Sequence, residues 1–387
     1  MPNHPDTSPG LPLAGIRVAD FSRVLAGPLA TMVLADLGAD VIKIERPETG
    51  DDTRGWGPPF LGDDAAYFLS LNRNKRSVVL DLSTDEGRDA ARRLALSSDV
   101  VVENFRPGLM ERFGLGHATL SAERPDIVTC SLTAFGDGEV EAARPGYDII
   151  VQAMSGLMSF TGHPGGEPTK VGVALLDVIC GLYAATAIQA ALMGRRDSGR
   201  GARVTVSLFD ASVAALVNQA ANYLIGGIVP QPMGNQHPNI VPYQLFEASD
   251  RPFILAAGND RLFERTCLVI GRPDLARDER FETNEARVRN RTVLVEMLTE
   301  AFAARRADQW LTELTSVAVP CGPVWRVDEV FGSPVGRRTV QEVDDPARGS
   351  LRLVANPIHV DGATPPLRRA PPRLGEHTDE VLAELED

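Results

Sequence analysis

The feature that most constrains the fold is a long apolar segment near the middle of the chain, at residues 178–195. Small residues alternate there with larger aliphatic ones, so an α-helix built from this segment is apolar on nearly every face. Such a helix is stable only when other elements cover nearly every side of it. An extended run, VGVALL at residues 171–176, leads into the segment through Asp177. We therefore expect a short strand, then Asp177, then a buried central helix.

Asp177 stands at the predicted N-cap of this helix. A carboxylate there meets free backbone N–H groups and the positive end of the helix dipole, so we expect it to stay ionised and to hold a fixed direction. These properties suit a nucleophile, but they equally suit a plain helix cap. Asp148 in GYD and Asp210 in LFD also begin apolar helices. The pattern alone therefore leaves the choice among the three aspartates open.

Predicted strands and helices alternate before this stretch. Apolar strands are expected at GIRVADFS, VIKIERP, RSVVLDL, DVVVENF and DIVTCSLTAF. This alternation is typical of an α/β fold with a parallel sheet covered on both faces. The arrangement is Rossmann-like, yet the first strand-to-helix turn reads LAGPLA rather than GxGxxG. The dinucleotide fingerprint is therefore absent, which argues against an NAD enzyme.

A second, smaller domain is expected further along the chain. The segment VPQPMGNQHPNIVP carries four prolines and is typical of a linker and loop. After it, RPFILAAGN indicates a strand, and residues 287–305 and 308–317 indicate helices, as in an α+β domain. Short strands at residues 326–330 and 352–360 are expected to lead the chain back. We therefore divide the chain into a large domain over residues 1–225, a small domain over 226–330, and a return to the large domain over 331–387.

The charge balance of 39 Lys and Arg against 52 Asp and Glu gives a formal net charge of −13. This balance argues against sequence-independent binding of nucleic acid or membranes. An anionic ligand must then be held by a local cluster of cations. The candidates are NRNKR at residues 72–76, the pair Arg106 and Arg112, and Arg46. A charge run such as NRNKR is, however, more often a solvated face.

Several other chemistries lack their sequence patterns. The six histidines have no metal-ligand spacing, the four cysteines form no CxxC pair, and no GxSxG elbow of a serine hydrolase is present. The first residues show neither a signal nor a transit peptide, and no apolar run reads as long and unbroken enough to span a bilayer. We expect a cytoplasmic protein that binds no metal, nucleic acid or membrane.

The central segment GYDIIVQAMSGLMSFTG, followed by a Pro-containing loop and GVALLD before a helix, resembles the central motif of the family III CoA-transferases of the CaiB/BaiF type. The resemblance runs from LAGIRVADFSRVLAGP to PPRLGEHTDEVL. It implies an α/β large domain, a smaller α+β domain and an interlocked homodimer. It also implies an acyl-CoA donor and a carboxylic acid acceptor as partners.

The same resemblance assigns site residues. Asp177 corresponds to the catalytic nucleophile, which attacks the donor thioester to give a mixed anhydride and then an aspartyl-CoA thioester. Contacts to coenzyme A, the substrate carrier, are implied for Val24, Leu25, Ala26, Arg46, Leu80, Asn104, Phe105, Arg112 and Tyr147. Arginine suits phosphate groups because its planar fork donates two hydrogen bonds together.

Within the family the chain most resembles succinyl-CoA:glutarate-type transferases, in segments such as GDDTRGWGPPF and LNRNKRS. It lacks the GGGG loop of the formyl-CoA branch. The alternative is an alpha-methylacyl-CoA racemase on the same fold, in which a histidine replaces Tyr147. Tyrosine is a poor base near neutral pH, since its reference pKa is about 10, and this favours transfer. His237 in GNQHPN either borders the acyl pocket, as the family implies, or is a turn histidine.

Overall fold

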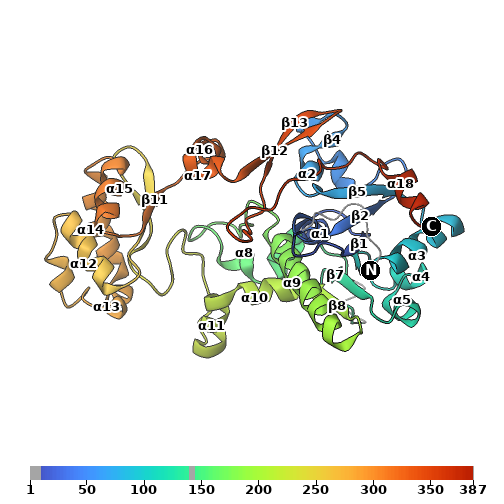
Figure 1. Cartoon of the computed structure of the whole chain (residues 1–387). Coiled ribbons are helices and arrows are strands. Elements are labelled where there is room, and N and C mark those ends of the chain that lie inside the picture. Colours follow the sequence, from blue (N-terminus) through green and yellow to red (C-terminus); the bar gives the residue numbers. More distant parts are fainter. Residues whose placement is uncertain (1–9, 139–143, 387) are drawn as a thin grey trace. The chain divides into compact units, whose positions relative to one another are not determined.

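The computed structural model describes residues 10–138 and 144–386, which form two compact units (Figure 1). The first unit contains the described residues up to Leu157, then Lys170–Ile228 and the described residues from Arg338 onward. The second contains Met158–Thr169 and Val229–Arg337. The domain limits at residues 225 and 330 stay a prediction. The sequence analysis placed residues 158–169 in the large domain, whereas the structure groups Met158–Thr169 with the second unit.

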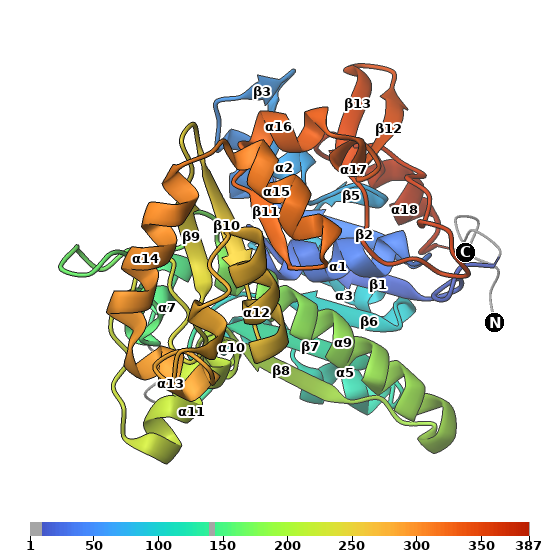
Figure 2. The ribbon, with the colours of Figure 1, turned by 90° about the vertical axis from the view of Figure 1, so that its left-hand side faces the viewer.

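A sheet of six parallel strands forms the centre of the first unit. Figure 2 shows their order from one edge to the other: β5 (Lys75–Val79), β2 (Asp40–Glu45), β1 (Arg17–Asp20), β6 (Val100–Glu103), β7 (Val128–Thr133) and β8 (Arg203–Ser207). The chain winds outward from β1 to β5, then restarts with β6 on the other side of β1. Ligands of α/β sheets bind at such a reversal, beyond the carboxyl ends of the strands. The predicted parallel α/β sheet is confirmed.

Successive residues of these strands enter different cores. Val18 of β1 packs on one face of the sheet and Ala19 on the other, and Val41 and Ile42 of β2 divide in the same way. This follows from the two-residue period of a strand. Because both faces are covered, the strands read as near-continuous apolar runs.

The long apolar helix is α9 (Leu175–Ser198), which covers one face of the sheet with α1 (Ala26–Asp36) and α10 (Leu208–Ala215). The small residues of α9 allow a close approach to α1. A Cβ added at Gly181 would lie 2.6 Å from the carbonyl oxygen of Ala26. The extended run predicted at residues 171–176 is wrong, because residues 171–174 are irregular and the helix has already begun at Leu175.

By length and composition alone α9 could cross a membrane, since its most apolar window reaches a mean hydropathy of 1.7. The sequence-based statement that no segment is long and apolar enough is therefore wrong. The same composition is typical of the core helix of a globular protein. Cys180, Ala184 and Ile188 of α9 are fully buried in the core shared with the sheet, which supports a core helix.

The other face of the sheet is covered by α3 (Asp85–Ser97), α4 (Leu109–Arg112), α5 (His117–Glu123) and α18 (Thr378–Ala383). The N-cap of α3 is Thr84, whose hydroxyl accepts a hydrogen bond from the amide of Gly87 at 3.0 Å. The C-terminal segment is tied to this unit by Arg76, whose guanidinium lies 2.6 Å from the carboxylate of Glu384.

Shorter elements complete the first unit and its connections. They are η1 (Asp52–Gly55), β3 (Phe60–Leu61), β4 (Asp64–Ala65), α2 (Ala66–Leu69), α7 (Asp148–Met154), α8 (Leu157–Phe160), α11 (Val217–Gly226), β12 (Val340–Asp345) and β13 (Gly349–Val354). Two antiparallel ribbons form, β3 with β4 and β12 with β13. The strand predicted at residues 352–360 is correct only where it overlaps the end of β13.

An antiparallel sheet and a helical layer form the second unit. The strands are β9 (Tyr243–Glu247), β10 (Pro252–Ala256) and β11 (Cys321–Pro323). The helices are α12 (Asp260–Val269), η2 (Leu275–Arg277), α13 (Asn284–Arg289), α14 (Arg291–Ala303), α15 (Ala307–Ser316), α16 (Val327–Gly332) and α17 (Pro334–Arg337). Its core centres on Phe302, whose ring contacts those of Phe246, Phe253 and Trp310. The strand predicted at residues 326–330 is wrong, because α16 occupies that segment.

Candidate active site

A pocket opens at the reversal point of the six-stranded sheet, and all its walls belong to the first unit. We call it the switch-point pocket. It is lined by residues that follow the carboxyl ends of β1, β6 and β7, and by the starts of α7, α9 and α10: Arg23, Val24, Leu25, Ala26, Asp52, Asn104, Phe105, Arg106, Leu132, Thr133, Ala134, Pro145, Gly146, Tyr147, Asp177 and Leu208. Seven of the ten predicted site residues therefore meet around one cavity.

Asp177 is not the N-cap of α9, which corrects the sequence-based prediction. It is the third residue of the helix, whose N-cap position is held by Ala174. The capping carboxylate is that of Asp148, from the start of α7. It accepts hydrogen bonds from the amides of Leu176, at 2.8 Å, and Asp177, at 3.4 Å. The side chain of Asp177 is thereby left facing the switch-point pocket rather than its own helix end.

The expected permanent ionisation of Asp177 is also wrong. Burial of its carboxyl group, followed by the nearby charge of Asp148, raises its pKa to about 7. The helix dipole does not reverse this, because the amides at the start of α9 are already bonded to Asp148. Those amides are for the same reason not available to an oxyanion. Asp177 is therefore partly protonated at neutral pH in the unliganded chain.

The three candidate aspartates differ in their surroundings. Asp148 is buried and bonded to α9 and to Gln152, whose amide donates to it at 2.5 Å. Asp210 is exposed in the first turn of α10, and its amide donates to the capping hydroxyl of Ser207 at 3.0 Å. Only Asp177 lines the switch-point pocket. The structure thus distinguishes Asp177 from the two aspartates that the sequence pattern could not exclude.

Asn104 and Phe105 follow β6 on the pocket wall. The side-chain amide of Asn104 accepts from the N–H of Arg23 at 2.8 Å and donates to its carbonyl oxygen at 2.7 Å. The guanidinium of Arg23 lies over the ring of Phe105, 5.2 Å from its centre. Tyr147, at the N-cap of α7, is 66% exposed and also lines the pocket. Asn104 therefore braces the loop after β1 as well as lining the pocket.

The remaining predicted contacts lie in two adjoining pockets. Arg46 and Leu80 line one of them with Phe105, and Arg46 is ion-paired with Asp52. Arg112 lines the other, together with Arg106 and Arg144. Arg144 was not predicted as a site residue, although it stands three positions before Tyr147. Arg106, Arg112 and Arg144 form no ion pair within residues 10–138 and 144–386, so this second pocket offers three cations to an anion.

The run NRNKR does not supply a phosphate site. Its three charged residues are buried in the first unit. Arg73 is paired with Asp36 at 2.5 Å, Lys75 with Asp20 at 3.2 Å, and Arg76 with Asp40 at 2.7 Å. Both earlier readings, a phosphate-binding cluster and a solvated face, are wrong, because carboxylates distant in the sequence neutralise the run inside the fold.

The comparison with known families decides the class of this site. A family model described as CoA-transferase family III matches residues 13–378. The chain belongs to CoA-transferase family III. This family III enzyme therefore acts on CoA thioesters.

Relatives of known name agree over the whole length. The succinate–glutarate CoA-transferase of Agrobacterium fabrum is 44% identical over 100% of this chain and 98% of that protein. The succinyl-CoA:glutarate CoA-transferase of Homo sapiens is 39% identical over 97% and 86%, respectively. Among solved structures, a CAIB/BAIF family protein from Brucella suis is 44% identical, covers 97% of this chain and 99% of its own, and gives a TM-score of 0.84. The resemblance inferred from the motifs is confirmed, and the racemase alternative is not favoured.

His237 belongs to the second unit of the family III enzyme. Its ring packs against Tyr243, with centres 5.3 Å apart, and its Nδ1 accepts from the amide of Asn239 at 3.1 Å. Burial, followed by the charge of Arg291, lowers its pKa. These contacts account for it as a turn histidine, and its role toward substrate stays a prediction.

In the described part of the chain, no group of three or more His, Cys, Asp or Glu could hold a metal ion.

Proposed function

We propose that this family III enzyme moves CoA between succinyl-CoA and a second short dicarboxylate such as glutarate, with Asp177 as the nucleophile. The observation that carries the proposal is the position of Asp177 on the switch-point pocket with Val24, Asn104 and Tyr147. The names of the Agrobacterium fabrum and Homo sapiens relatives support the choice of acids. CoA would lie in this pocket and extend into the adjoining ones that hold Arg46, Leu80 and Arg112.

The proposed reaction runs through three covalent states of Asp177. Its carboxylate attacks the thioester carbonyl of the donor, the C–S bond breaks, and a mixed anhydride and CoA thiolate form. The thiolate attacks the aspartyl carbonyl, which releases the donor acid and leaves an aspartyl-CoA thioester. The acceptor carboxylate then attacks this thioester, the C–S bond breaks, and a second mixed anhydride and CoA thiolate form. The thiolate attacks the acceptor carbonyl of this anhydride, which gives the new acyl-CoA and releases the carboxylate of Asp177. No proton is gained or lost overall, and the aspartate is regenerated.

Each attack creates an oxyanion that needs hydrogen-bond donors. The amides of Leu25 and Ala26, at the start of α1, make no hydrogen bond to any acceptor in the described residues. They border the same pocket as Asp177, and the positive end of the helix dipole favours negative charge there. These amides are the donors that we propose for the developing charge.

An acceptor panel tests the choice of substrates. Wild-type enzyme is given succinyl-CoA with glutarate, mesaconate, oxalate, acetate or no acid, and new acyl-CoA is measured by liquid chromatography. The highest kcat/KM is expected with glutarate or another short dicarboxylate. Preference for a monocarboxylate would contradict the proposal. Deuterium entering the α-carbon of a branched acyl-CoA without any acceptor would instead support a racemase.

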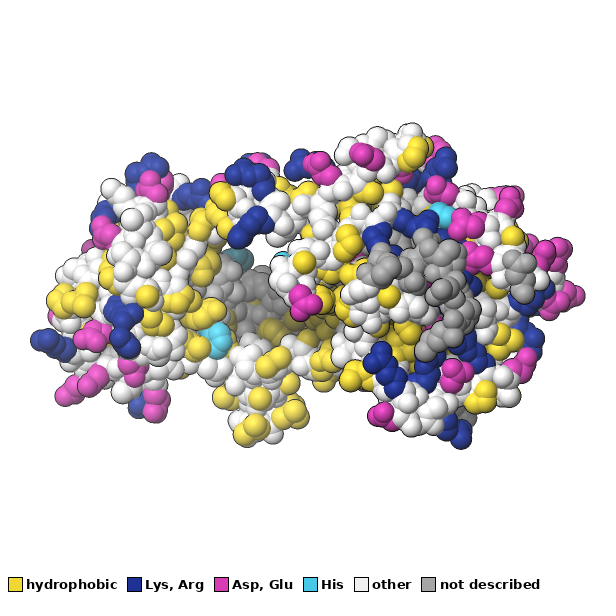
Figure 3. All heavy atoms as spheres, viewed as in Figure 1, with side chains coloured by type: hydrophobic (Ala, Val, Ile, Leu, Met, Phe, Trp, Pro, Cys, Tyr) yellow, Lys and Arg dark blue, Asp and Glu magenta, His cyan; other side chains and the backbone are white. Residues whose placement is uncertain are grey.

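The homodimer implied by the family also remains a proposal. Its support is apolar surface on α9 and α11, where Met193 is 68% exposed, Leu224 79% and Ile225 89%, and Figure 3 shows apolar side chains gathered over α11. Exposed patches of this kind mark protein interfaces. Light scattering of the purified enzyme should give twice the chain mass, and a stable monomer would refute the dimer. The cytoplasmic location stays a prediction.

A further inference from the structure

Val24, on the wall of the switch-point pocket, has an unusual backbone conformation. Its φ is +70°, in the left-handed region that β-branched residues avoid because Cβ crowds the backbone there. Such a conformation persists only where surrounding contacts enforce it. Val24 directly precedes Leu25 and Ala26, so its conformation sets the direction in which α1 begins.

The enforcing contact comes from Asp51, which is 1% exposed. The N–H of Val24 donates to both oxygens of this carboxylate, at 3.2 and 3.3 Å. The same carboxylate accepts from the amide and the hydroxyl of Thr53, at 2.9 and 2.7 Å. Asp51 thus holds Val24 and the start of η1 together.

Lys43, from β2, connects Asp51 to the loop a second time. Its ammonium group is fully buried, 2.8 Å from the carboxylate of Asp51, and donates to the carbonyl oxygen of Ser22 at 2.9 Å. Between these points, Asn104 bonds to both backbone groups of Arg23. Ser22, Arg23 and Val24 of the loop after β1 are therefore each held by a side chain from outside the loop.

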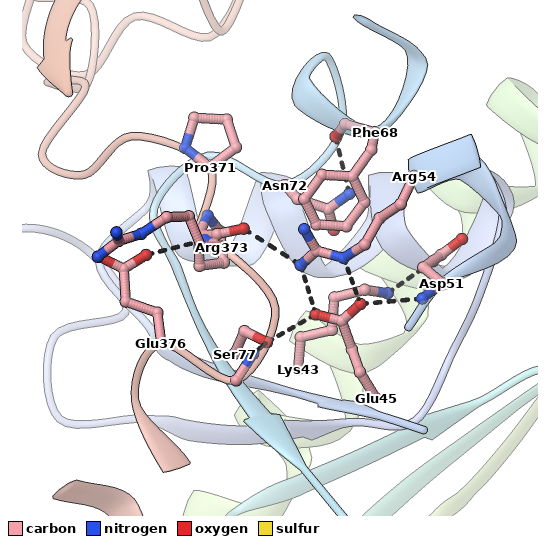
Figure 4. A network of polar contacts seen from close by, with 12 residues as sticks. Lys43, Glu45, Asp51, Arg54, Phe68, Asn72, Ser77, Pro371, Arg373 and Glu376 are labelled. Carbon is pink, nitrogen blue, oxygen red and sulfur yellow. Dashed lines mark hydrogen bonds and ion pairs between the residues drawn. The ribbon is translucent and has the colours of Figure 1, made fainter. Parts of the chain in front are cut away.

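Asp51 is itself fixed by Glu45 (Figure 4). The amide of Asp51 donates to the carboxylate of Glu45 at 2.9 Å. That carboxylate accepts from Arg54 at 2.6 and 2.8 Å and from the hydroxyl of Ser77 at 2.6 Å. Figure 4 shows Lys43, Glu45, Asp51 and Arg54 in one connected network. The position of Asp51 is therefore set by this network and not by the loop after β1 that it holds.

We propose that Asp51, held in place by Lys43, is a positioning residue for CoA binding, which acts by holding Val24 left-handed and so fixing Leu25 and Ala26 at the pocket. This rests on the proposed binding of CoA there, but not on the identity of the acids. Neither side chain lines the switch-point pocket. Both border the adjoining pocket with Arg46, yet a direct charge effect has the opposite sign: removing the negative charge of Asp51 would favour a bound phosphate.

The test is the dissociation constant of CoA, measured by calorimetry. Asp51→Asn should weaken binding about tenfold, the size of one lost charged hydrogen bond. Glycine adopts a left-handed φ without strain, so the same substitution should have a smaller effect when Val24→Gly is also present. If Asp51→Asn does not fold, Thr53→Val removes one donor to the carboxylate at nearly constant volume and should weaken binding about threefold.

Asp40→Asn is the matched control. Asp40 is a buried carboxylate of the same unit, paired with Arg17 at 3.1 Å and with Arg76 at 2.7 Å, and neither partner belongs to the network around Asp51. It should lower Tm and leave CoA affinity unchanged. Unchanged or tighter CoA binding by Asp51→Asn, or an equal loss in the Val24→Gly background, would overturn the inference. Failure of the wild type to bind CoA would instead refute the proposed function.

Discussion

At the residue scale, the protonation of Asp177 sets the pH dependence. Only its carboxylate form can attack a thioester, and burial with the charge of Asp148 raises its pKa to about 7. We expect kcat/KM to rise about tenfold per pH unit below this value and to level off above it. Initial rates with succinyl-CoA between pH 5.5 and 9 measure the midpoint. A flat profile across this range would contradict the account.

Asp148→Asn tests the electrostatic part of that shift. Asparagine keeps an acceptor oxygen for the amide of Leu176 but removes the negative charge beside Asp177, so the midpoint should move to lower pH. Burial remains, so the midpoint should stay above that of a solvated aspartate. Asp210→Asn, at the exposed start of α10, is the control and should leave the midpoint in place. A shift to higher pH in Asp148→Asn would refute this reading.

The carboxyl group of Asp177 affects folding stability in the opposite direction: activity should rise with pH, whereas the stability of the fold should fall. With its pKa raised on folding, the carboxyl group of Asp177 binds more protons in the folded than in the unfolded chain between pH 4 and 7, so its ionisation costs stability as pH rises through this window. The stability of Asp177→Asn relative to wild type should therefore increase by about 3 kcal/mol between pH 5 and pH 8. Urea unfolding at pH 5 and pH 8 compares the two. A constant difference at both pH values would contradict the raised pKa.

At the scale of elements, the contact between α1 and α9 depends on a missing side chain. A Cβ at Gly181 would lie 2.6 Å from a backbone oxygen of α1, whereas one at Gly194, in the same helix, meets nothing within 4 Å. Gly181→Ala should cost about 1–3 kcal/mol of unfolding free energy, and Gly194→Ala should add about 0.5–1 kcal/mol. Denaturant unfolding measures both. If both substitutions changed the unfolding free energy in the same direction, the close approach of α1 and α9 at Gly181 would be contradicted.

At the scale of the whole molecule, Arg76 of β5 ties the C-terminal helix α18 to the six-stranded sheet. It is 2% exposed and pairs with Asp40, Glu380 and Glu384. Arg76→Gln should cost about 3 kcal/mol or more, because buried acids lose a partner, and should expose α18 to proteolysis. Arg92→Gln breaks an ion pair between side chains that are 39% and 44% exposed and should cost under about 1 kcal/mol. Similar losses in both would refute the buried network.

The sequence predicted what depends on neighbouring residues. The central helix α9 and the strands β1, β2, β5, β6 and β7 follow from local apolar patterns. The cap of α9 did not, because Asp148 stands 28 positions before Leu176. The burial of NRNKR was likewise hidden, since its partners Asp20, Asp36 and Asp40 come from another part of the chain. The choice of Asp177 came from the family resemblance, and the pKa of its side chain required the folded surroundings.

The most direct test of the account is mass spectrometry of the protein after incubation with succinyl-CoA. We expect a covalent adduct that maps to the Asp177 peptide, is released by hydroxylamine, and is absent from Asp177→Ala, which should still bind CoA but show no transfer. Turnover by Asp177→Ala, or an adduct on a different residue in the wild type, would contradict the central role of Asp177.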